Sequence, residues 1–289
     1  MTLIAFGCPI QAIVQAYGLD ERTIDSWRDP AGKPCELVHH TLLEQGQLEA
    51  VHVQTDEIRV KARGMVVWIG LALIVSSRLW LAGVVSQTRD THLTDRLLLQ
   101  VRACCRAGSN LLVCTDGWAA YPASIKRAFR NRVKATAGRG RACLRVWSGL
   151  CIATVIKRME HKHVVKVTRK MTMGTLESAH DLLQASGGGT ALNTTFIERF
   201  NATMRERLAT LTRRCRHEAH RIYLLETGMY LVGSTYNCCP HQKLSKRRSP
   251  GQQKQTPAMA SGITDYIWSV QELVSYKVAS PPCVGPKRR

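Results

Sequence analysis

Three strand-like runs in succession, within residues 51–86, constrain the fold more than any other feature of this chain. Residues 51–55 alternate apolar and polar side chains. Residues 65–76 and 79–86 are apolar and rich in β-branched side chains, with a break at Ser76, Ser77 and Arg78. Alternation and short apolar runs bounded by turns are typical of strands. We therefore predict an antiparallel meander of three strands.

A helix and a short buried strand are predicted next. Residues 90–105 place Leu93, Leu97 and Val101 on one helical face, and residues 110–115 form a short apolar run. The resulting order, three strands, a helix and a fourth strand, predicts an α/β core with a mixed sheet of about five strands flanked by helices.

The second half of the chain is predicted to alternate basic loops with regular elements. A basic loop is expected at residues 134–145, strands at 150–156 and 163–168, and helices at 176–184, 193–216, 218–238 and 262–278. The helix at residues 193–216 has a clear apolar stripe, which consists of Ile197, Phe200, Met204, Leu208 and Leu211. Residues 241–255 are polar and basic, and residues 281–289 resemble a disordered tail.

Residues 10–27 predict two short helices around a tight turn at Gly18. Asp20 can cap the second helix, and Ile24 and Trp27 would form its apolar side. Such a unit is either a helix-turn-helix, whose second helix enters a DNA groove, or a plain helical hairpin. Both alternatives remain open from the sequence.

Two arginines would contact DNA if the helix-turn-helix interpretation is right. Arg22 lies in the second helix and Arg28 follows it. Residues 28–37 contain two prolines and a glycine and are predicted to be a linker. We therefore expect residues 1–34 to form a separate module in front of a larger domain at residues 50–240, with a basic linker and tail at 241–289.

Basic residues outnumber acidic ones, and most of the excess lies in the second half of the chain. The formal net charge is +20. Residues 1–50 contain three basic and seven acidic residues, whereas residues 193–289 contain 16 and 6. A chain this basic is attracted to polyanions such as nucleic acid or an anionic membrane surface.

No targeting or membrane-spanning segment is predicted. Residues 1–18 lack the basic start and the long apolar stretch of a secretory signal. The most apolar run, residues 65–75, has 11 residues, whereas a membrane helix needs about 20. The 11 cysteines have no framework spacing, which is typical of reduced thiols inside a cell. We expect a cytoplasmic protein that does not bind a membrane.

Three acidic residues stand in places where a carboxylate is unusual. Asp56 follows the first alternating strand, Asp116 follows the buried fourth strand, and Glu198 lies at the edge of the apolar face of an arginine-rich helix. Carboxylates that converge from separate elements can hold two Mg²⁺ ions about 3.5–4 Å apart. Taken alone, Glu198 could simply pair with Arg199 or Arg205. Its coincidence with two aspartates that end strands favours a metal site, with Glu57 on the opposite strand face as a structural residue.

The strings around these acids resemble one known family. They are TDE at residues 55–57, CTDGWAAY at 114–121 and NTTFIERFNATMRERLATLTRR at 193–214. Together they resemble bacterial insertion-sequence transposases of the DDE type, in particular those with I-E-R-x-N-x-x-x-R-x-R around the catalytic glutamate. The resemblance covers about residues 50–240.

The resemblance implies an RNase H-like catalytic core and a set of roles. Asp56, Asp116 and Glu198 would be the catalytic, metal-binding residues, with Mg²⁺ or Mn²⁺ as cofactor. Asp116 and Glu198 lie 82 residues apart (198 − 116), which implies an insertion at about residues 130–192. The residues expected to contact DNA on and after the glutamate helix are Asn201, Arg205, Arg213, Arg214 and Arg216.

A transposase of this kind would cleave element ends and join them to target DNA in the bacterial nucleoid. Its partners would be double-stranded DNA, at the terminal inverted repeats and at the target, and further copies of itself in an oligomer. Two rivals stay open. One is an RNase H-like nuclease without strand transfer, and the other is an inactive, element-derived regulator that only binds DNA.

Overall fold

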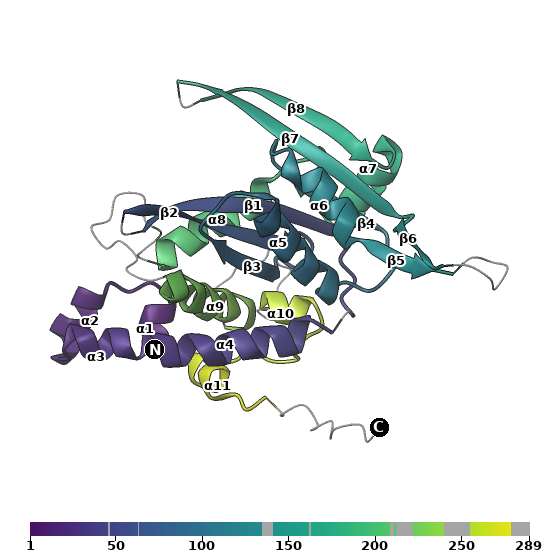
Figure 1. Ribbon diagram of the computed structural model, residues 1–289. Coiled ribbons are helices and arrows are strands. Elements are labelled where there is room, and N and C mark those ends of the chain that lie inside the picture. Colours follow the sequence, from purple (N-terminus) through teal and green to yellow (C-terminus); the bar gives the residue numbers. More distant parts are fainter. Residues whose placement is uncertain are drawn as a thin grey trace, which may run out of the picture.

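A computed structural model of the chain describes residues 1–45, 47–62, 64–134, 141–161, 163–208, 211, 222–239 and 255–278. Its centre is a six-stranded sheet in the order β3-β2-β1-β4-β7-β8 (Figure 1). The strands are β1 (His52–Ala62), β2 (Met65–Ile74), β3 (Trp80–Ser86), β4 (Leu111–Thr115), β7 (Leu150–Glu160) and β8 (His163–Met173).

The sheet is mixed, as the sequence predicts, but it has one strand more than expected. The predicted antiparallel meander of β1, β2 and β3 is confirmed. β4 and β7 lie parallel to β1, and β8 returns antiparallel to β7. The strands predicted at residues 150–156 and 163–168 are present as β7 and β8, and both are longer than predicted. Residues 130–192 therefore supply two strands of the main sheet, and only the small hairpin of β5 (Arg130–Val133) and β6 (Cys143–Val146) lies outside it.

Helices cover both faces of the sheet. Gly70 of β2 faces Leu93 and Leu97 of α5 (Thr91–Cys104), which packs against α6 (Ala120–Ala128). Gly70 pairs with Glu57 on β1, so Glu57 points to the same face. The neighbouring Asp56 points to the other face, where it meets Asn201 of α8 (Thr195–Arg207). The α5 helix and the α8 helix therefore lie on opposite sides.

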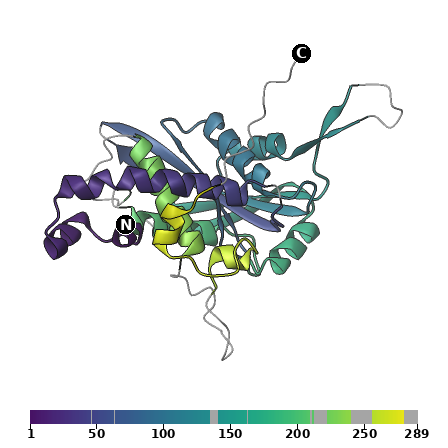
Figure 2. The same ribbon diagram turned by 90° about the horizontal axis from the view of Figure 1, so that it is seen from below.

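A layer of helices lies beneath the β3 side of the sheet (Figures 1 and 2). The α4 helix (Arg28–Leu43) runs beside the almost fully buried α9 helix (Ile222–Cys238), which packs on β3. The approach is close, because a Cβ on Gly32 of α4 would lie 2.5 Å from the side chain of Thr227. Short helices complete the layer, namely α1 (Thr2–Ala5), α2 (Ile10–Tyr17), α3 (Glu21–Ser26), α10 (Pro257–Ala260) and α11 (Val270–Ser275).

The linker predicted at residues 28–37 is wrong, because these residues belong to α4. Ala31, Cys35, Val38 and Leu43 are all buried and follow the spacing of a helical face. Burial of that face against α9 outweighs the unfavourable local effect of Pro34 inside the helix. The α4 helix also runs through residue 34, where a module boundary was expected.

The two predicted N-terminal helices are present, but a helix-turn-helix is not established. Gly18 ends α2 in the left-handed conformation at φ 62°, and the Asp20 side chain accepts a bond from the Arg22 N–H at the start of α3. Ile24 is buried as expected, whereas Trp27 is exposed. The α3 helix is short, and α4 begins directly after Trp27.

Other predicted boundaries shift by some residues. The helix predicted at residues 193–216 ends at Arg207, although its whole apolar stripe is buried. The helix predicted at 262–278 is confined to α11. The α7 helix (Leu176–Ala185) is close to its predicted bounds. The basic segment 241–254 and the tail after residue 278 lie outside the described residues. None of the helices in the described ranges is both long and apolar enough to cross a membrane.

Candidate active site

A cleft opens where β4 ends between two longer neighbours. The pairing of β1 with β4 stops at Gln54, and that of β7 with β4 stops at Thr154, yet both outer strands continue. The space beyond the end of β4 has a volume of about 530 Å³. It is lined by Asp56, Arg89, Asp116, Gly117, Trp118, Ala119, Val155, Ile156, Lys157, Thr194 and Glu198. Crevices at the carboxyl ends of parallel strands are a common place for ligands in α/β proteins.

All three acids predicted from the sequence line this one cleft. Asp116 follows β4 directly, as expected, and its Oδ1 accepts a hydrogen bond of 3.0 Å from the Trp118 N–H. Asp56 was predicted to end its strand. It lies instead within β1, just past the last residue that pairs with β4. The end of β4, rather than the end of β1, exposes the Asp56 carboxylate to the cleft.

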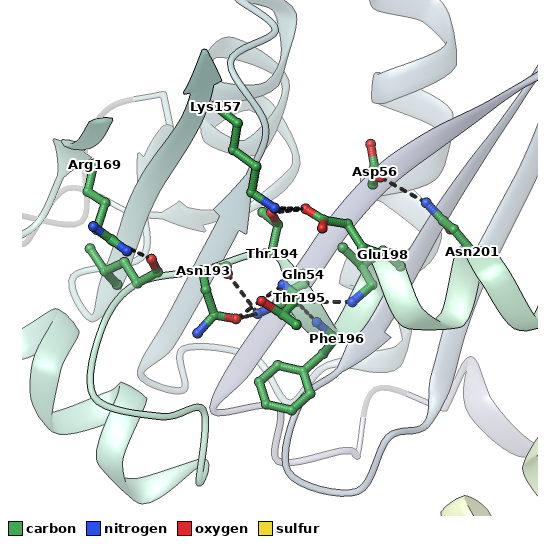
Figure 3. A network of polar contacts seen from close by, with 12 residues as sticks. Gln54, Asp56, Lys157, Arg169, Asn193, Thr194, Thr195, Phe196, Glu198 and Asn201 are labelled. Atoms are coloured by element: carbon green, nitrogen blue, oxygen red, sulfur yellow. Dashed lines mark hydrogen bonds and ion pairs between the residues drawn. The ribbon is translucent and has the colours of Figure 1, made fainter. Parts of the chain in front are cut away.

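Asn201 holds Asp56 in place. Its side-chain N–H donates to Asp56 Oδ2 at 2.8 Å, while the Glu57 N–H donates to Oδ1 at 2.8 Å. Asn201 is only 1% exposed. The DNA contact predicted for Asn201 stays a prediction; in the structure its buried amide is directed at the Asp56 carboxylate and holds it in position (Figure 3).

Gln54 fixes the start of the helix that carries Glu198. The α8 helix has no cap from its own N-cap residue, Thr194. Instead, the Gln54 side chain accepts hydrogen bonds from the N–H groups of Phe196, at 3.0 Å, and Ile197, at 3.1 Å (Figure 3). Gln54 and Asp56 are two residues apart on β1, so they share a face. This contact places the first turn of α8, with Glu198, beside Asp56.

Glu198 is held by two further residues of the cleft wall. Its Oε1 accepts a hydrogen bond of 2.6 Å from the Thr194 hydroxyl and pairs with the Lys157 ammonium group, which comes from β7 (Figure 3). The predicted alternative, an ion pair of Glu198 with Arg199 or Arg205, is not the pairing observed. The partner comes from the opposite wall of the cleft.

Negative charge gathers in this cleft around the largely buried carboxylates of Asp56 and Glu57. One oxygen from each of Asp56, Glu57 and Asp116 lies within 4.8 Å of the other two. Burial, together with the charges of Asp116 and Glu198, raises the pKa of Asp56 from 3.8 to about 6, while the hydrogen bond from the Glu57 N–H and the charge of Arg205 oppose the shift. Hard cations such as Mg²⁺ favour carboxylate oxygens, so the residues present fit a divalent metal.

Glu57 is the acid of this cluster that was not expected to take part. Burial raises its pKa to about 7. Its carboxylate is almost wholly buried and pairs with Arg89 at 2.8 Å. Arg89 also reaches Asp116 at 3.4 Å and lies over the rings of Trp68 and Trp118, at 5.0 and 4.4 Å from their centres. With Glu57 neutralised by Arg89, Asp56 and Asp116 are the better placed of the three to share a metal.

The arginines predicted to bind DNA lie in different surroundings from one another. Arg205 lies close enough to Asp56 to act on its pKa. Arg22 is exposed on α3, whereas the Arg28 side chain is 17% exposed and pairs with Asp25 at 3.5 Å, so it is poorly placed to contact DNA. Arg213, Arg214 and Arg216 lie outside the described residues.

Sequence reasoning missed Gln54, Arg89, Lys157 and Thr194. Gln54, between Val53 and Thr55, looks in the sequence like the polar position of an alternating strand, although it is fully buried in the structure. Arg89 and Lys157 look like ordinary solvated charges in the sequence, and only the fold brings them to the cleft. A scan against models of known protein families and a search of curated proteins both found no match to this chain.

Proposed function

We propose that this chain is a DNA transposase that cleaves and joins phosphodiester bonds with the help of divalent metal ions. The observation that carries the proposal is the convergence of Asp56, Asp116 and Glu198, from three separate elements, on one cleft. These are the acids that the resemblance to DDE transposases singles out. A surface ion pair would not require that convergence.

The arrangement of the sheet is compatible with an RNase H-like core, which is the fold that the resemblance implies. An antiparallel meander is followed by two parallel strands, and the first aspartate lies on β1 while the second follows β4. Helix α8 carries the glutamate across one face. The net charge of +20 supports a polyanionic substrate, and duplex DNA fits it.

In this proposal, Asp56 and Asp116 would hold Mg²⁺ or Mn²⁺, and Glu198 would complete the ligand set. Two such ions activate the attacking oxygen and stabilise the leaving oxygen in phosphoryl transfer. Asn201 keeps the Asp56 carboxylate aimed at the cleft, and Gln54 keeps the first turn of α8 in register with it. Lys157 and Arg89 line the same cleft, where their cationic groups can meet DNA phosphates.

The remaining parts of the proposal concern the partners. The α2–α3 unit is kept as a candidate helix-turn-helix, with exposed Arg22 as its DNA contact. Terminal inverted repeats and target DNA would be the substrates, held by an oligomer of the chain. A nuclease without strand transfer and a regulator without catalysis are the competing outcomes of the test.

The test is cleavage and strand transfer with oligonucleotides that carry the repeats flanking the gene. Asp56→Asn, Asp116→Asn and Glu198→Gln should each reduce Mg²⁺-dependent cleavage at least 100-fold, because each removes a metal ligand. DNA binding should be retained, and none of the three variants should be less stable than the parent protein. Asp181→Asn, which changes an exposed acid on α7, is the matched control and should stay active.

Each rival predicts a different result. A nuclease would give cleavage without joined products, and a regulator would give metal-independent binding alone. Full activity in any one of the three variants would remove that residue from the site.

A further inference from the structure

Strands β7 and β8 continue past the rest of the sheet as a two-stranded ribbon. β4 pairs with β7 only up to Thr154, whereas β7 and β8 remain paired as far as Glu160 and His163. Figure 1 shows the two strands extending together beyond the other four. We define the β7–β8 ribbon as residues 155–160 and 163–170. At about 3.3 Å per residue, its free part is roughly 20 Å long.

The β7–β8 ribbon is strongly basic. Its only acidic residue is Glu160, and its basic side chains are Lys157, Arg158, Lys166, Arg169 and Lys170. Arg158 and Lys166 stand directly opposite each other, a placement that destabilises a strand pair unless a counter-charge is present. Glu160 pairs with Arg158 at 3.1 Å. Neither Lys166 nor Lys170 forms an ion pair with an acid in the described part of the chain.

Large apolar side chains are exposed among these charges. Ile156, Met159, Val164 and Val165 are each between 44% and 59% exposed. Met159 pairs with Val164 across the ribbon, and the pairing shifts between Arg158 and Met159, which leaves Val165 as the extra residue of a bulge. Bulges increase twist and re-aim side chains next to functional sites. The ribbon surface therefore offers positive charges for phosphates and apolar side chains for the apolar groups on base edges, such as thymine methyl groups.

The β7–β8 ribbon is continuous with the candidate active site. Ile156 and Lys157, at its base, line the cleft. Lys166, Thr168 and Lys170 alternate along β8 and therefore share one face, and Thr168 pairs with Ile156. This face continues outward from the part of the cleft that Ile156 lines, whereas Lys157, Met159 and Val164 lie on the other face of the ribbon. A nucleic acid whose backbone enters the cleft would meet it.

We propose that the β7–β8 ribbon enters the major groove of duplex DNA and supplies part of the sequence discrimination of this protein. The major groove of B-DNA, about 12 Å wide, admits a two-stranded ribbon. Lys166 and Lys170 bind the flanking phosphates, while Met159 and Val164 contact base edges, including thymine methyl groups. This inference rests on the proposed function, because it takes the DNA held in the cleft as the ligand.

Two other arrangements are less consistent with the ribbon. A second copy could pair with the free edge of β8, but lysines on an edge strand oppose strand addition. The α3 helix could be the only reader of sequence, but it has six residues, and Arg28 after it is paired with Asp25. Duplex DNA is the occupant that satisfies the charge and the exposed apolar side chains together.

The first experiment measures how many phosphate contacts the ribbon lysines make, from the salt dependence of the affinity for DNA. The full-length protein, kept free of metal, selects from a pool of 30-base-pair duplexes with random centres, and its affinity for a selected duplex is measured from low to high salt. Lys166→Ala with Lys170→Ala should flatten the log–log salt dependence by about two units, because each phosphate contact contributes about 0.9. Lys33→Ala with Lys277→Ala, which removes two exposed lysines of the helical layer, should leave it unchanged.

The second experiment measures discrimination. Met159→Ser with Val164→Ser should reduce the preference for the selected duplex over a shuffled one about tenfold, with little change in salt dependence. Leu144→Ser removes an equally exposed apolar side chain from the β5–β6 hairpin and should keep the preference. Thermal unfolding of every variant confirms that it is folded.

The results separate this inference from the proposed function. If both ribbon variants keep the salt dependence and the preference of the parent protein, the ribbon does not bind DNA and the inference is overturned. The inference is also overturned if the ribbon variants change only the oligomeric state of the free protein, measured by sedimentation. The ribbon would then be a contact between copies of the chain. If the parent protein selects and binds no duplex at all, the proposed function itself fails.

Discussion

At the scale of single residues, Asp56 and Glu57 determine the electrostatics of the cleft. They are neighbours on β1 and point to opposite faces, yet both come close to Asp116, because Asp116 follows the end of β4 level with them. Both carboxyls bind a proton more tightly in the folded chain than in the unfolded chain, with pKa values raised to about 6 and about 7. The negative charge on Asp56 is therefore unfavourable for folding until a cation arrives.

The sign of the resulting pH dependence follows from these shifts. A carboxyl whose pKa is raised by folding contributes stability at low pH and loses it as the pH rises through the folded-state value. In EDTA, the stability contributed by Asp56 and Glu57 should thus be lost between about pH 4 and pH 7. Asp56→Asn should therefore become more stable than the parent protein over that range, by about 1–3 kcal/mol at pH 7.

The measurement is thermal or urea unfolding at a series of pH values without metal, with Asp181→Asn as the control for an exposed acid. Saturating Mg²⁺ should raise the stability of the parent protein and not that of Asp56→Asn, since a ligand stabilises only the state that binds it. A stability difference that is the same at pH 4 and at pH 7 would contradict the assigned cause.

At the scale of elements, the α8 helix is positioned by β1 rather than by its own cap. Gln54 is fully buried, accepts from two N–H groups at the start of α8 and donates to the Asn193 carbonyl oxygen at 2.8 Å. Two residues along β1, Asp56 accepts from Asn201 one turn further into α8. These two contacts set the distance between the Asp56 carboxylate and the Glu198 side chain.

Gln54→Ala should therefore affect both stability and catalysis. It leaves two buried N–H groups without an acceptor, which should cost about 2–4 kcal/mol of unfolding free energy. Cleavage at a temperature where the variant is folded should fall at least tenfold, because α8 is freed to move. Ser269→Ala, which removes the cap of α11, should cost about 1 kcal/mol and leave cleavage unchanged. Equal cleavage by both variants would mean that Gln54 has no part in positioning Glu198.

At the scale of the whole molecule, the six-stranded sheet and the helical layer meet along β3 and α9. The α4 and α9 helices approach so closely that a Cβ on Gly32 would lie 2.6 Å from the Thr227 carbonyl oxygen as well as 2.5 Å from its side chain. The cleft residues lie on or beyond β1, β4 and β7, between β3 and α5, and at the start of α8, not on α4 or α9. Damage to the helical layer should therefore lower stability without altering the site.

Gly32→Ala tests that separation. Alanine favours a helix by about 1 kcal/mol over glycine, but the overlap with backbone atoms of α9 should outweigh this and give a net loss of about 1–3 kcal/mol. Mg²⁺ affinity should change less than about threefold, measured by titration of the folded variant. Lys33 is exposed on the same helix, so Lys33→Ala should change neither the unfolding free energy nor the Mg²⁺ affinity. An increase in unfolding temperature for Gly32→Ala would contradict the packing described.

The sequence by itself determined the elements with strong local patterns. The meander within residues 51–86, the α5 helix, β4, and the Gly18 and Asp20 signals around α3 all follow from spacing and from turn and cap chemistry, which act over a few residues. The motifs around Asp56, Asp116 and Glu198 also singled out three acids that share one cleft.

Only the tertiary structure decided how those acids are held. Gln54 meets Asn193 across 139 positions, and Lys157 meets Glu198 across 41, so no local pattern announces either contact. The α4 helix forms through Pro34 because burial against α9 outweighs a weak local propensity. Asp56 faces the cleft because β4 is shorter than both of its neighbours, and the relative length of paired strands is a property of the assembled sheet.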